Sequence, residues 1–322
     1  MPHDDSSSTA DVHFGVGLSD EGGPEAAAAA ACLAAQRAIA PAQARGLLIC
    51  DNFEGEHAAV LTGACSVADA SIVHGAVTFS QFSHDGAPAD KSVGALAIGG
   101  NDVQVTAQAV ADIRDREEAS GVELAKRLAP AVENAQGSKV LILIGDCHVP
   151  RNEQLLQGVQ DVLGDTLPIV GCSAKLAPDV CVYHAGELVE GGTIGVLVSG
   201  KFRLGLASAS VGWRKGTSQQ IASSAGAGVT AVMDDLQATP DLILGFNCGG
   251  RRGLLLKDDP TRVAGELDEI RRVLPEGVPL LTMYGSGEMG HVHRDEAATA
   301  VGFHIMLCAI AAASTDPREH TA

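Results

Sequence analysis

Six short polar segments, each directly after an apolar run, carry most of the side chains that could do chemistry in this sequence. Three place a cysteine beside a carboxylate or an amide: Cys50-Asp51-Asn52, Asp146-Cys147-His148 and Asn247-Cys248-Gly249-Gly250. The other three are Val73-His74-Gly75, Gly171-Cys172-Ser173 and Tyr284-Gly285-Ser286-Gly287-Glu288. Ligands of open α/β sheets bind beyond the carboxyl ends of strands, so these six segments are the predicted binding region.

Two of the eight cysteines, Cys172 and Cys248, precede small residues whose amides can point at a ligand or an oxyanion. Free cysteine is also among the most buried residue types and packs like a small hydrophobe. Both interpretations stay open for these two. If their sulfurs meet across a cleft, they can act as a nucleophile or as a two-thiol acid/base pair. Packing is the expected role of Cys32, Cys65, Cys181 and Cys308.

The turn Gly249-Gly250-Arg251 offers backbone amides and a guanidinium fork, which suit a carboxylate or a phosphate. We expect Arg251 to hold the anionic end of a ligand and Glu288 to meet an amine or another polar group. The alternative is a tight turn whose arginines pair with surface acids. The full set of expected ligand contacts is Gly171, Cys172, Ser173, Asn247, Cys248, Gly249, Gly250, Arg251, Tyr284, Glu288 and His74.

Other motifs predict neither a metal nor a cofactor. The run 285–290 fits G-x-G-x-x-G, but no convincing helix opening and no later acid follow it, so a dinucleotide site is not expected. Glu288, His291 and His293 lack a further fixed ligand for a metal. His74 follows an apolar run and can serve as a ligand contact or a haem ligand. The 3% aromatic content offers little to line a haem pocket.

Three segments repeat one order of elements, namely helix, buried strand, helix and second buried strand. The helices are predicted at 24–40, 54–67, 115–134, 152–163, 218–236 and 261–274, and the strands at 46–50, 72–79, 139–144, 168–172, 241–246 and 278–284. Continuous apolar runs such as Val140 to Ile144 are typical of strands covered on both faces. Alternating segments at 93–98, 193–199 and 202–211 predict antiparallel strands. The predicted fold class is α/β, with repeated units forming mixed, mostly parallel sheets flanked by helices, and with 46–50, 140–144 and 242–246 central.

Composition narrows the class of protein. The net charge of −18 argues against nucleic acid and anionic membrane surfaces as partners. No apolar run is long enough to span a bilayer, and the first ten residues lack the features of a signal peptide, so a cytoplasmic protein is expected. Scattered cysteines in a chain of 322 residues favour reduced thiols over a disulfide framework.

Four segments together resemble a known family. They are Ile169-Val170-Gly171-Cys172-Ser173-Ala174, Ser208 to Trp213, Phe246-Asn247-Cys248-Gly249-Gly250-Arg251 and Met283-Tyr284-Gly285-Ser286-Gly287-Glu288. In this order they are similar to motifs of the FIST N and FIST C modules, from about Val12 to Ala313. The resemblance implies a FIST N-like domain of two units over 11–215 and a FIST C-like domain over 216–314, with polar tails at 1–10 and 315–322. The connection between Trp213 and Asp241 is shorter than usual for the family.

The resemblance also implies a function. FIST modules are sensory modules for small ligands, proposed to include amino acids, and a branch of the family binds haem and senses nitric oxide. No output module follows in this chain, so a separate signalling protein is the expected partner. A ligand-binding sensor for an amino-acid-like or other anionic molecule is therefore the first hypothesis. A cysteine-dependent hydrolase, lyase or isomerase is the second and a haem-based sensor the third, and whether the chain is an enzyme stays open.

Overall fold

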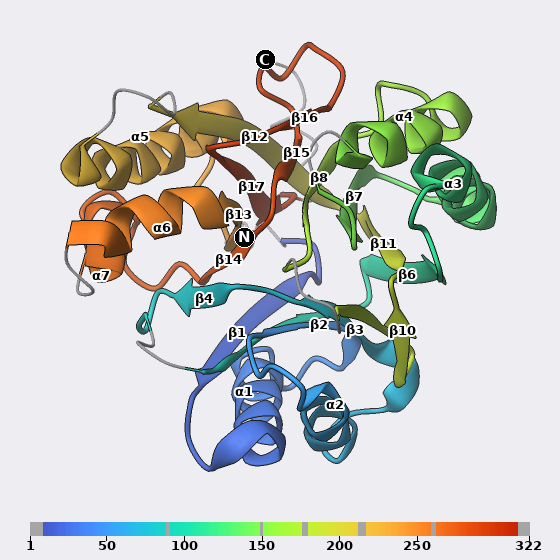
Figure 1. The fold of residues 1–322 in the computed structure, drawn as a ribbon. Helices are drawn as coiled ribbons and strands as arrows, with labels where there is room; N and C mark the ends of the chain where they lie inside the picture. The colour runs from blue at the N-terminus through green and yellow to red at the C-terminus, as the bar shows by residue number, and fades with distance from the viewer. Residues whose placement is uncertain are drawn as a thin grey trace, which may run out of the picture.

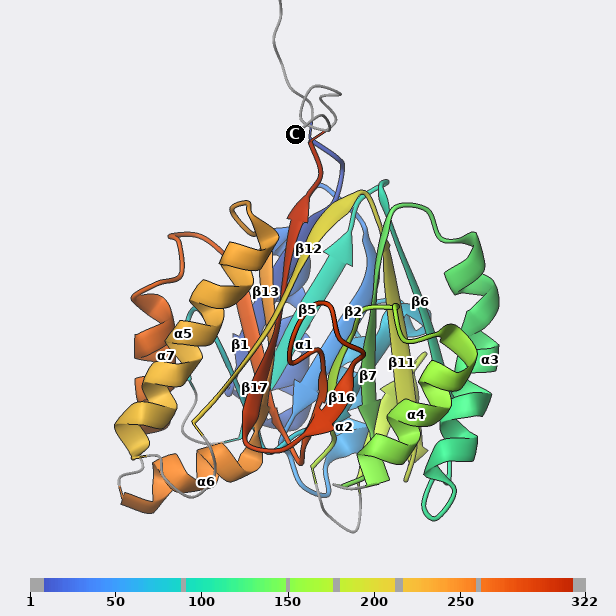
Figure 2. The same cartoon turned by 90° about the horizontal axis from the view of Figure 1, so that it is seen from above.

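A computed structural model describes residues 9–87, 91–148, 151–175, 180–211, 217–258 and 262–314. Three β-sheets stand around a common axis, and each carries its helices on its outer face (Figure 1). From above, α5 and α7 lie on one side of the molecule and α3 and α4 on the other, with strands between them (Figure 2). No helix in the described part of the chain is both long and apolar enough to cross a membrane.

The first sheet has the order β1 (His13–Ser19), β5 (Val93–Gly99), β2 (Ala44–Asp51), β3 (Val73–Val77), β9 (Cys181–His184) and β10 (Glu187–Glu190). Its helices are α1 (Gly23–Ala38) and α2 (His57–Cys65). Alanine is the best helix former, and proline suits the first turn, which explains an α1 that begins at Gly23-Pro24 and is rich in alanine. Helix α1 packs closely on β1, because a Cβ built on Gly17 would lie 2.0 Å from the carbonyl oxygen of Ala31.

The second sheet has the order β16 (Thr299–Val301), β15 (Glu288–Gly290), β8 (Ile169–Ser173), β7 (Ser138–Gly145), β11 (Thr193–Gly200) and β6 (Val103–Val110), with α3 (Glu117–Asn134) and α4 (Arg151–Leu163). The third has the order β12 (Phe202–Ser210), β17 (His304–Ala312), β13 (Leu242–Cys248), β14 (Leu280–Gly285) and β4 (Ser80–Ser83), with α5 (Ser218–Leu236), α6 (Gly249–Asp258) and α7 (Arg262–Arg271). A capping box between Thr217 and Gln220 starts α5.

The three sheets share one topology. The orders β1-β5-β2-β3, β6-β11-β7-β8 and β12-β17-β13-β14 are equivalent, which confirms the predicted repeat of units. Each unit also gives one or two strands to a neighbouring sheet. Strand β4 of the first unit pairs with β14, β9 of the second pairs with β3, and β15 of the third pairs with β8. The exchange is cyclic, so every sheet contains strands of two units.

The predicted strands β2, β7 and β13 are central, as expected. Each has one parallel neighbour and one antiparallel neighbour. The α/β class with helix-flanked mixed sheets is confirmed, but the sheets are mostly antiparallel rather than mostly parallel. The reason is that the crossovers through α1, α3 and α5 join strands that are separated by an antiparallel strand, β5, β11 or β17.

The core has a central part and three outer parts. Inward side chains such as Leu48, Ile142 and Leu244 come from all three sheets and meet in one cluster around the axis. Three further clusters fill the spaces between each sheet and its helices. The low aromatic content fits this arrangement, because small aliphatic side chains pack at high density between closely spaced layers.

Two predicted boundaries differ from the structure. Strand β12, at Phe202–Ser210, belongs to the third sheet, so the third unit begins before the predicted break at 215/216. Thr9 pairs with Ser314, and Ala10 N donates to Ala313 O at 2.9 Å, so these residues are not part of a tail. Residues 1–8 and 315–322, and the segment 212–216 around the predicted break, lie outside the described residues.

Candidate functional site

The ends of the paired parallel strands meet at one junction. Lys175 N, after β8, donates to Val77 O at the end of β3 (3.0 Å). Ser286 N, after β14, donates to Ser173 O (2.9 Å), and Phe79 N donates to Tyr284 O (2.9 Å). The segments that follow β3, β8 and β14 are thus hydrogen-bonded to one another. The carboxyl ends of the parallel strands of all three units therefore face one region, as the sequence predicts.

A cavity with a volume of about 480 Å³ lies at this junction. It is lined by Phe79 of the first unit, His148 of the second, and Cys248, Gly249, Gly250, Ser286, Gly287, Gly302 and Phe303 of the third. Among the predicted ligand contacts, only Cys248, Gly249 and Gly250 line it. A Cβ on Gly249 would lie 2.6 Å from the Phe79 ring, and one on Gly250 would lie 3.0 Å from the Phe303 ring. Both rings approach the backbone closely, so a side chain at Gly249 would displace Phe79 and one at Gly250 would crowd Phe303.

Cys248 ends β13, and α6 begins directly after it. Its side chain faces inward and is 6% exposed, while the neighbouring Asn247 faces the helices. The backbone amides of Phe303, Arg251 and Gly250 lie near the Cys248 side chain. Burial, followed by the nearby Glu288, raises the pKa of the thiol to about 11, and the three amides act in the opposite direction. The site therefore holds a protonated thiol with donors already aimed at its sulfur.

Glu288 lies on β15, directly opposite Cys172 of β8 in the strand register, and is fully buried. Its Oε2 accepts a hydrogen bond from His304 N (3.1 Å), whereas Oε1 has no hydrogen-bond partner with good geometry among the described residues. Burial raises the pKa of Glu288 to about 8, although His304 N and the adjacent Cys248 side chain favour the carboxylate. This carboxyl group can take up and release a proton near neutral pH.

Cys172 is placed differently from Cys248. It is fully buried in the central core, and a Cβ on Gly285 would lie 2.7 Å from its sulfur. Burial raises the pKa of this thiol well above its ordinary value, and Glu288 adds to the effect. Cys172 does not line the cavity, so the packing interpretation fits it. Only Cys248 of the two faces the cavity, so the cavity does not support the hypothesis of two thiols facing each other across a cleft.

The prediction that Arg251 contacts an anionic ligand is corrected by its surroundings. Its guanidinium is fully buried and pairs with Glu266 Oε1 at 2.7 Å. It also donates to Asn247 Oδ1 (2.9 Å), Ser224 Oγ (3.0 Å) and Ile221 O (2.9 Å). The sequence motif is a strand end and a helix start, and the guanidinium points to the helix side of the sheet, so Arg251 ties α5, α6 and α7 to β13.

Two other predicted contacts belong to the same buried network. Asn247 Nδ2 donates to Glu266 Oε2 at 2.9 Å, and the Tyr284 hydroxyl donates to the same oxygen. Both side chains lie on the helix-facing side of the third sheet. Asn247 Oδ1 in turn accepts from Cys248 N (2.9 Å). These residues support the turn after β13 and do not line the cavity.

The remaining predicted contacts lie in the sheets. Gly171 allows β8 to approach β7, because a Cβ there would lie 1.8 Å from Leu143 O. Ser173 is buried, and its backbone holds the junction through Ser286 and Gly287.

His74 is buried on β3, and its ring stacks on His184 with centroids 5.3 Å apart. It does not line the cavity, so the haem-ligand hypothesis has no support from its placement.

Sequence reasoning identified the segments that contain His148 and Ser286 but missed Phe79, Gly302 and Phe303 as cavity residues. Phe79 lies at the end of the predicted strand 72–79, and this position could have indicated it as a cavity residue. Gly302 and Phe303 come from the turn between β16 and β17, two strands that no pattern predicted. Among the described residues, no group of three or more His, Cys, Asp or Glu side chains is placed to hold a metal ion.

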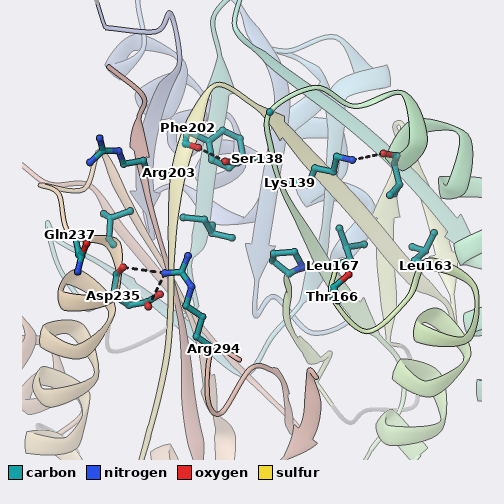
Figure 3. A pocket seen from close by; sticks show the side chains of 15 residues that line it. Ser138, Lys139, Leu163, Thr166, Leu167, Phe202, Arg203, Asp235, Gln237 and Arg294 are labelled. Carbon is teal, nitrogen blue, oxygen red and sulfur yellow. Dashed lines mark hydrogen bonds and ion pairs between the residues drawn. The ribbon is translucent and has the colours of Figure 1, made fainter. Parts of the chain in front are cut away.

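A larger cleft, about 730 Å³, lies at the opposite ends of β7 and β8, between the second and third units (Figure 3). Two of its three cationic side chains, Lys139 and Arg294, are held near helix ends, and the third is Arg203. Lys139 Nζ donates to Val132 O near the end of α3 (2.8 Å), and Arg294 pairs with Asp235 near the end of α5 (2.8 Å). Because helix C-termini already neutralise these cations, we place the candidate site at the Cys248 cavity instead.

Comparison with known proteins gives one family match. The FIST N domain profile matches residues 44–230. No curated protein sequence matches the chain. Among solved structures, the chain is similar to a cyanuric acid hydrolase from A. caulinodans (12% identity, TM-score 0.46, covering 94% of this chain and 99% of that one). It is also similar to a chorismatase (7% identity, TM-score 0.46, covering 95% and 100%). At this level the similarities concern the path of the chain and not its chemistry.

Proposed function

Because this chain belongs to the FIST family, whose members are small-ligand sensory domains, we propose that it binds a small molecule in the Cys248 cavity and works as a sensor. One observation carries the proposal. The cavity lies where the strand ends of all three units converge, and residues of each unit line it. A ligand there contacts segments of all three units, so its binding can shift how they are arranged.

The lining favours a particular chemistry. No Asp, Glu, Lys or Arg is among the described lining residues, and Phe79 and Phe303 supply apolar ring surface. His148 and Ser286 add polar groups. A small, flat and mostly uncharged molecule suits this lining better than the anion that Arg251 was expected to bind. In this proposal the signal then passes to a separate signalling protein.

Gly302→Trp tests the cavity directly. A Cβ on Gly302 meets no atom within 4 Å, and its φ is not in the left-handed region, so a large side chain is accommodated at the cavity wall. We expect a thermal-shift screen of amino acids, short carboxylic acids and aromatic alcohols to find compounds that stabilise the native protein. Saturation at 100 times Kd corresponds to about 2.7 kcal/mol. In Gly302→Trp this stabilisation should disappear.

Gly253→Trp is the matched control. Gly253 lies on α6, is exposed, also meets no atom within 4 Å and does not line the cavity. It should keep the ligand-induced shift of the native protein. If both variants lose the ligand-induced stabilisation equally, or both keep it equally, the ligand does not bind in this cavity.

A further inference from the structure

We infer that the ligand of this cavity is a carbonyl compound, and that the Cys248 thiol adds to its carbonyl carbon while Glu288 accepts the thiol proton. This inference rests on the proposed function, because it assigns a ligand class and a reaction to the same cavity. The inference differs from the proposed function because it requires a covalent bond between protein and ligand, which a simple binding site does not form.

The sulfur of Cys248 is the first part of the argument. It belongs to a cavity-lining residue and has the amides of Phe303, Arg251 and Gly250 around it. A Cβ on Gly250 would lie 3.4 Å from this sulfur, which shows how closely the glycine backbone approaches it. Backbone amides at the start of a helix stabilise negative charge, so they favour the thiolate that forms as the proton leaves.

The carboxyl group of Glu288 is the second, independent part. It is fully buried, and its Oε1 has no hydrogen-bond partner with good geometry in the described structure. Leaving a buried carboxyl oxygen without a partner costs free energy, so such atoms are rare in native proteins. Two thiols neighbour it, those of Cys172 and Cys248, and only Cys248 lines the cavity. This geometry suits an oxygen that receives the proton of the thiol.

The proposed step balances without a further reactant. A bond forms between Sγ of Cys248 and the carbonyl carbon, and the π electron pair of the carbonyl moves to its oxygen. The thiol proton passes to Glu288 and then to that oxygen, so the product is a hemithioacetal and Glu288 is a carboxylate again. The pKa of Glu288, about 8, allows it both to accept and to return the proton near neutral pH.

The ligand class follows from the lining. A thiol adds to an electrophilic carbonyl carbon, and the step requires a group that moves a proton from sulfur to oxygen, which is the arrangement of Cys248 and Glu288. Phe79 and Phe303 favour an aromatic or other flat body, and the described lining has no acidic or basic side chain other than His148. Benzaldehyde is a probe with this chemistry, and benzyl alcohol is its analogue without a carbonyl group.

The experiment uses benzaldehyde labelled with ¹³C at the carbonyl carbon and follows the protein by NMR. We expect a new resonance of a carbon bonded to sulfur and oxygen, which is absent in Cys248→Ala. Benzyl alcohol should compete with it. If benzyl alcohol binds in a Gly302-dependent way but no adduct resonance forms, the covalent inference is wrong and the proposed function stands. If neither probe binds while another compound of the thermal-shift screen binds in a Gly302-dependent way, the inference is wrong and the proposed function stands; if no compound binds in that way, both fail.

Glu288→Gln separates proton transfer from simple repulsion in the alkylation of Cys248 by iodoacetamide. If Glu288 takes the proton, the rate near pH 8 should fall by about 10²-fold. If Glu288 only repels the thiolate, its removal lowers the thiol pKa and the rate should rise, which would overturn the inference. Cys65, the one half-exposed cysteine, reports in the same sample on unassisted reaction and should not change. Should Glu288→Gln not fold, the native rate should rise up to about pH 8 and level off above it; a rate that keeps rising toward pH 11, as for an unassisted thiol, contradicts the proposal.

Discussion

Replacing Glu266 by Ala should lower the free energy of unfolding by about 3–5 kcal/mol. Glu266 and Arg251 are both fully buried, and their ion pair is 2.7 Å long. Without the carboxylate, the guanidinium of Arg251 stays buried with no counter-charge, and Asn247 and Tyr284 lose the oxygen they both donate to. Urea unfolding followed by circular dichroism measures the loss. A cost below about 1 kcal/mol would mean that Arg251 is not a structural residue.

Two further variants make this test specific. Arg272→Ala removes an ion pair between the exposed Arg272, directly after α7, and Glu269 of that helix, and it should change stability by no more than about 1 kcal/mol. The double variant Arg251→Met with Glu266→Leu removes both charges and replaces them with apolar groups. It should be more stable than Glu266→Ala alone, because no unpaired charge is left in the interior.

Acid should destabilise the protein through His74. Burial lowers the pKa of His74 to about 4, and the neighbouring His184 adds to the effect. In the unfolded chain the pKa is about 6.5, so below that pH the unfolded state binds a proton that the folded state does not. This contribution of His74 to stability is complete above pH 6.5 and is lost as pH falls toward 4, by about 3 kcal/mol.

Unfolding curves measured across this pH range check the prediction. His74→Gln should reduce the loss of stability between pH 6.5 and 4. Part of the loss should stay, because burial also lowers the pKa of His184, with Glu187 opposing and Arg127 supporting the shift. His293→Gln, at an exposed position, should leave the pH dependence unchanged. If stability falls equally with pH in the native protein, His74→Gln and His293→Gln, the loss is not due to His74.

Much of the fold could be predicted because its elements are long and strongly patterned. Helix α5 begins and ends at the predicted residues, and β7 extends the predicted strand by one residue at each end. The exchanged strands β4, β9, β10, β15 and β16 have three or four residues each, which is too short for a period to show. Helix α6 was missed because it opens on Gly249-Gly250, residues with poor helix propensity.

The site was predictable in place but not in detail. The predicted strand ends located the junction, because neighbouring parallel strands end at the same edge of a sheet whatever their side chains are. Which side chains reach the cavity depends on the face of the strand, and neighbours in sequence point to opposite faces. Asn247 therefore joins the Glu266 network while Cys248 reaches the cavity. Arg251 lies fifteen residues before its partner Glu266, on a different helix, and no local pattern indicates this pairing.

The cyclic exchange of strands has a consequence for how such a chain can arise. Strands β4, β9 and β15 each complete a sheet that belongs to another unit, in the same direction around the axis. One unit alone would have an unpaired strand edge in its sheet, and the strand that it gives to another sheet would have no pairing partner. Three separate copies of one ancestral unit, however, would close the same ring as a homotrimer by mutual strand swapping. Joining the three copies into one gene would then require only linkers between them, and each position near the axis would become free to diverge. Cys248 lines the cavity, whereas Cys50 and Cys147, at the corresponding strand ends of the other two units, lie in the core.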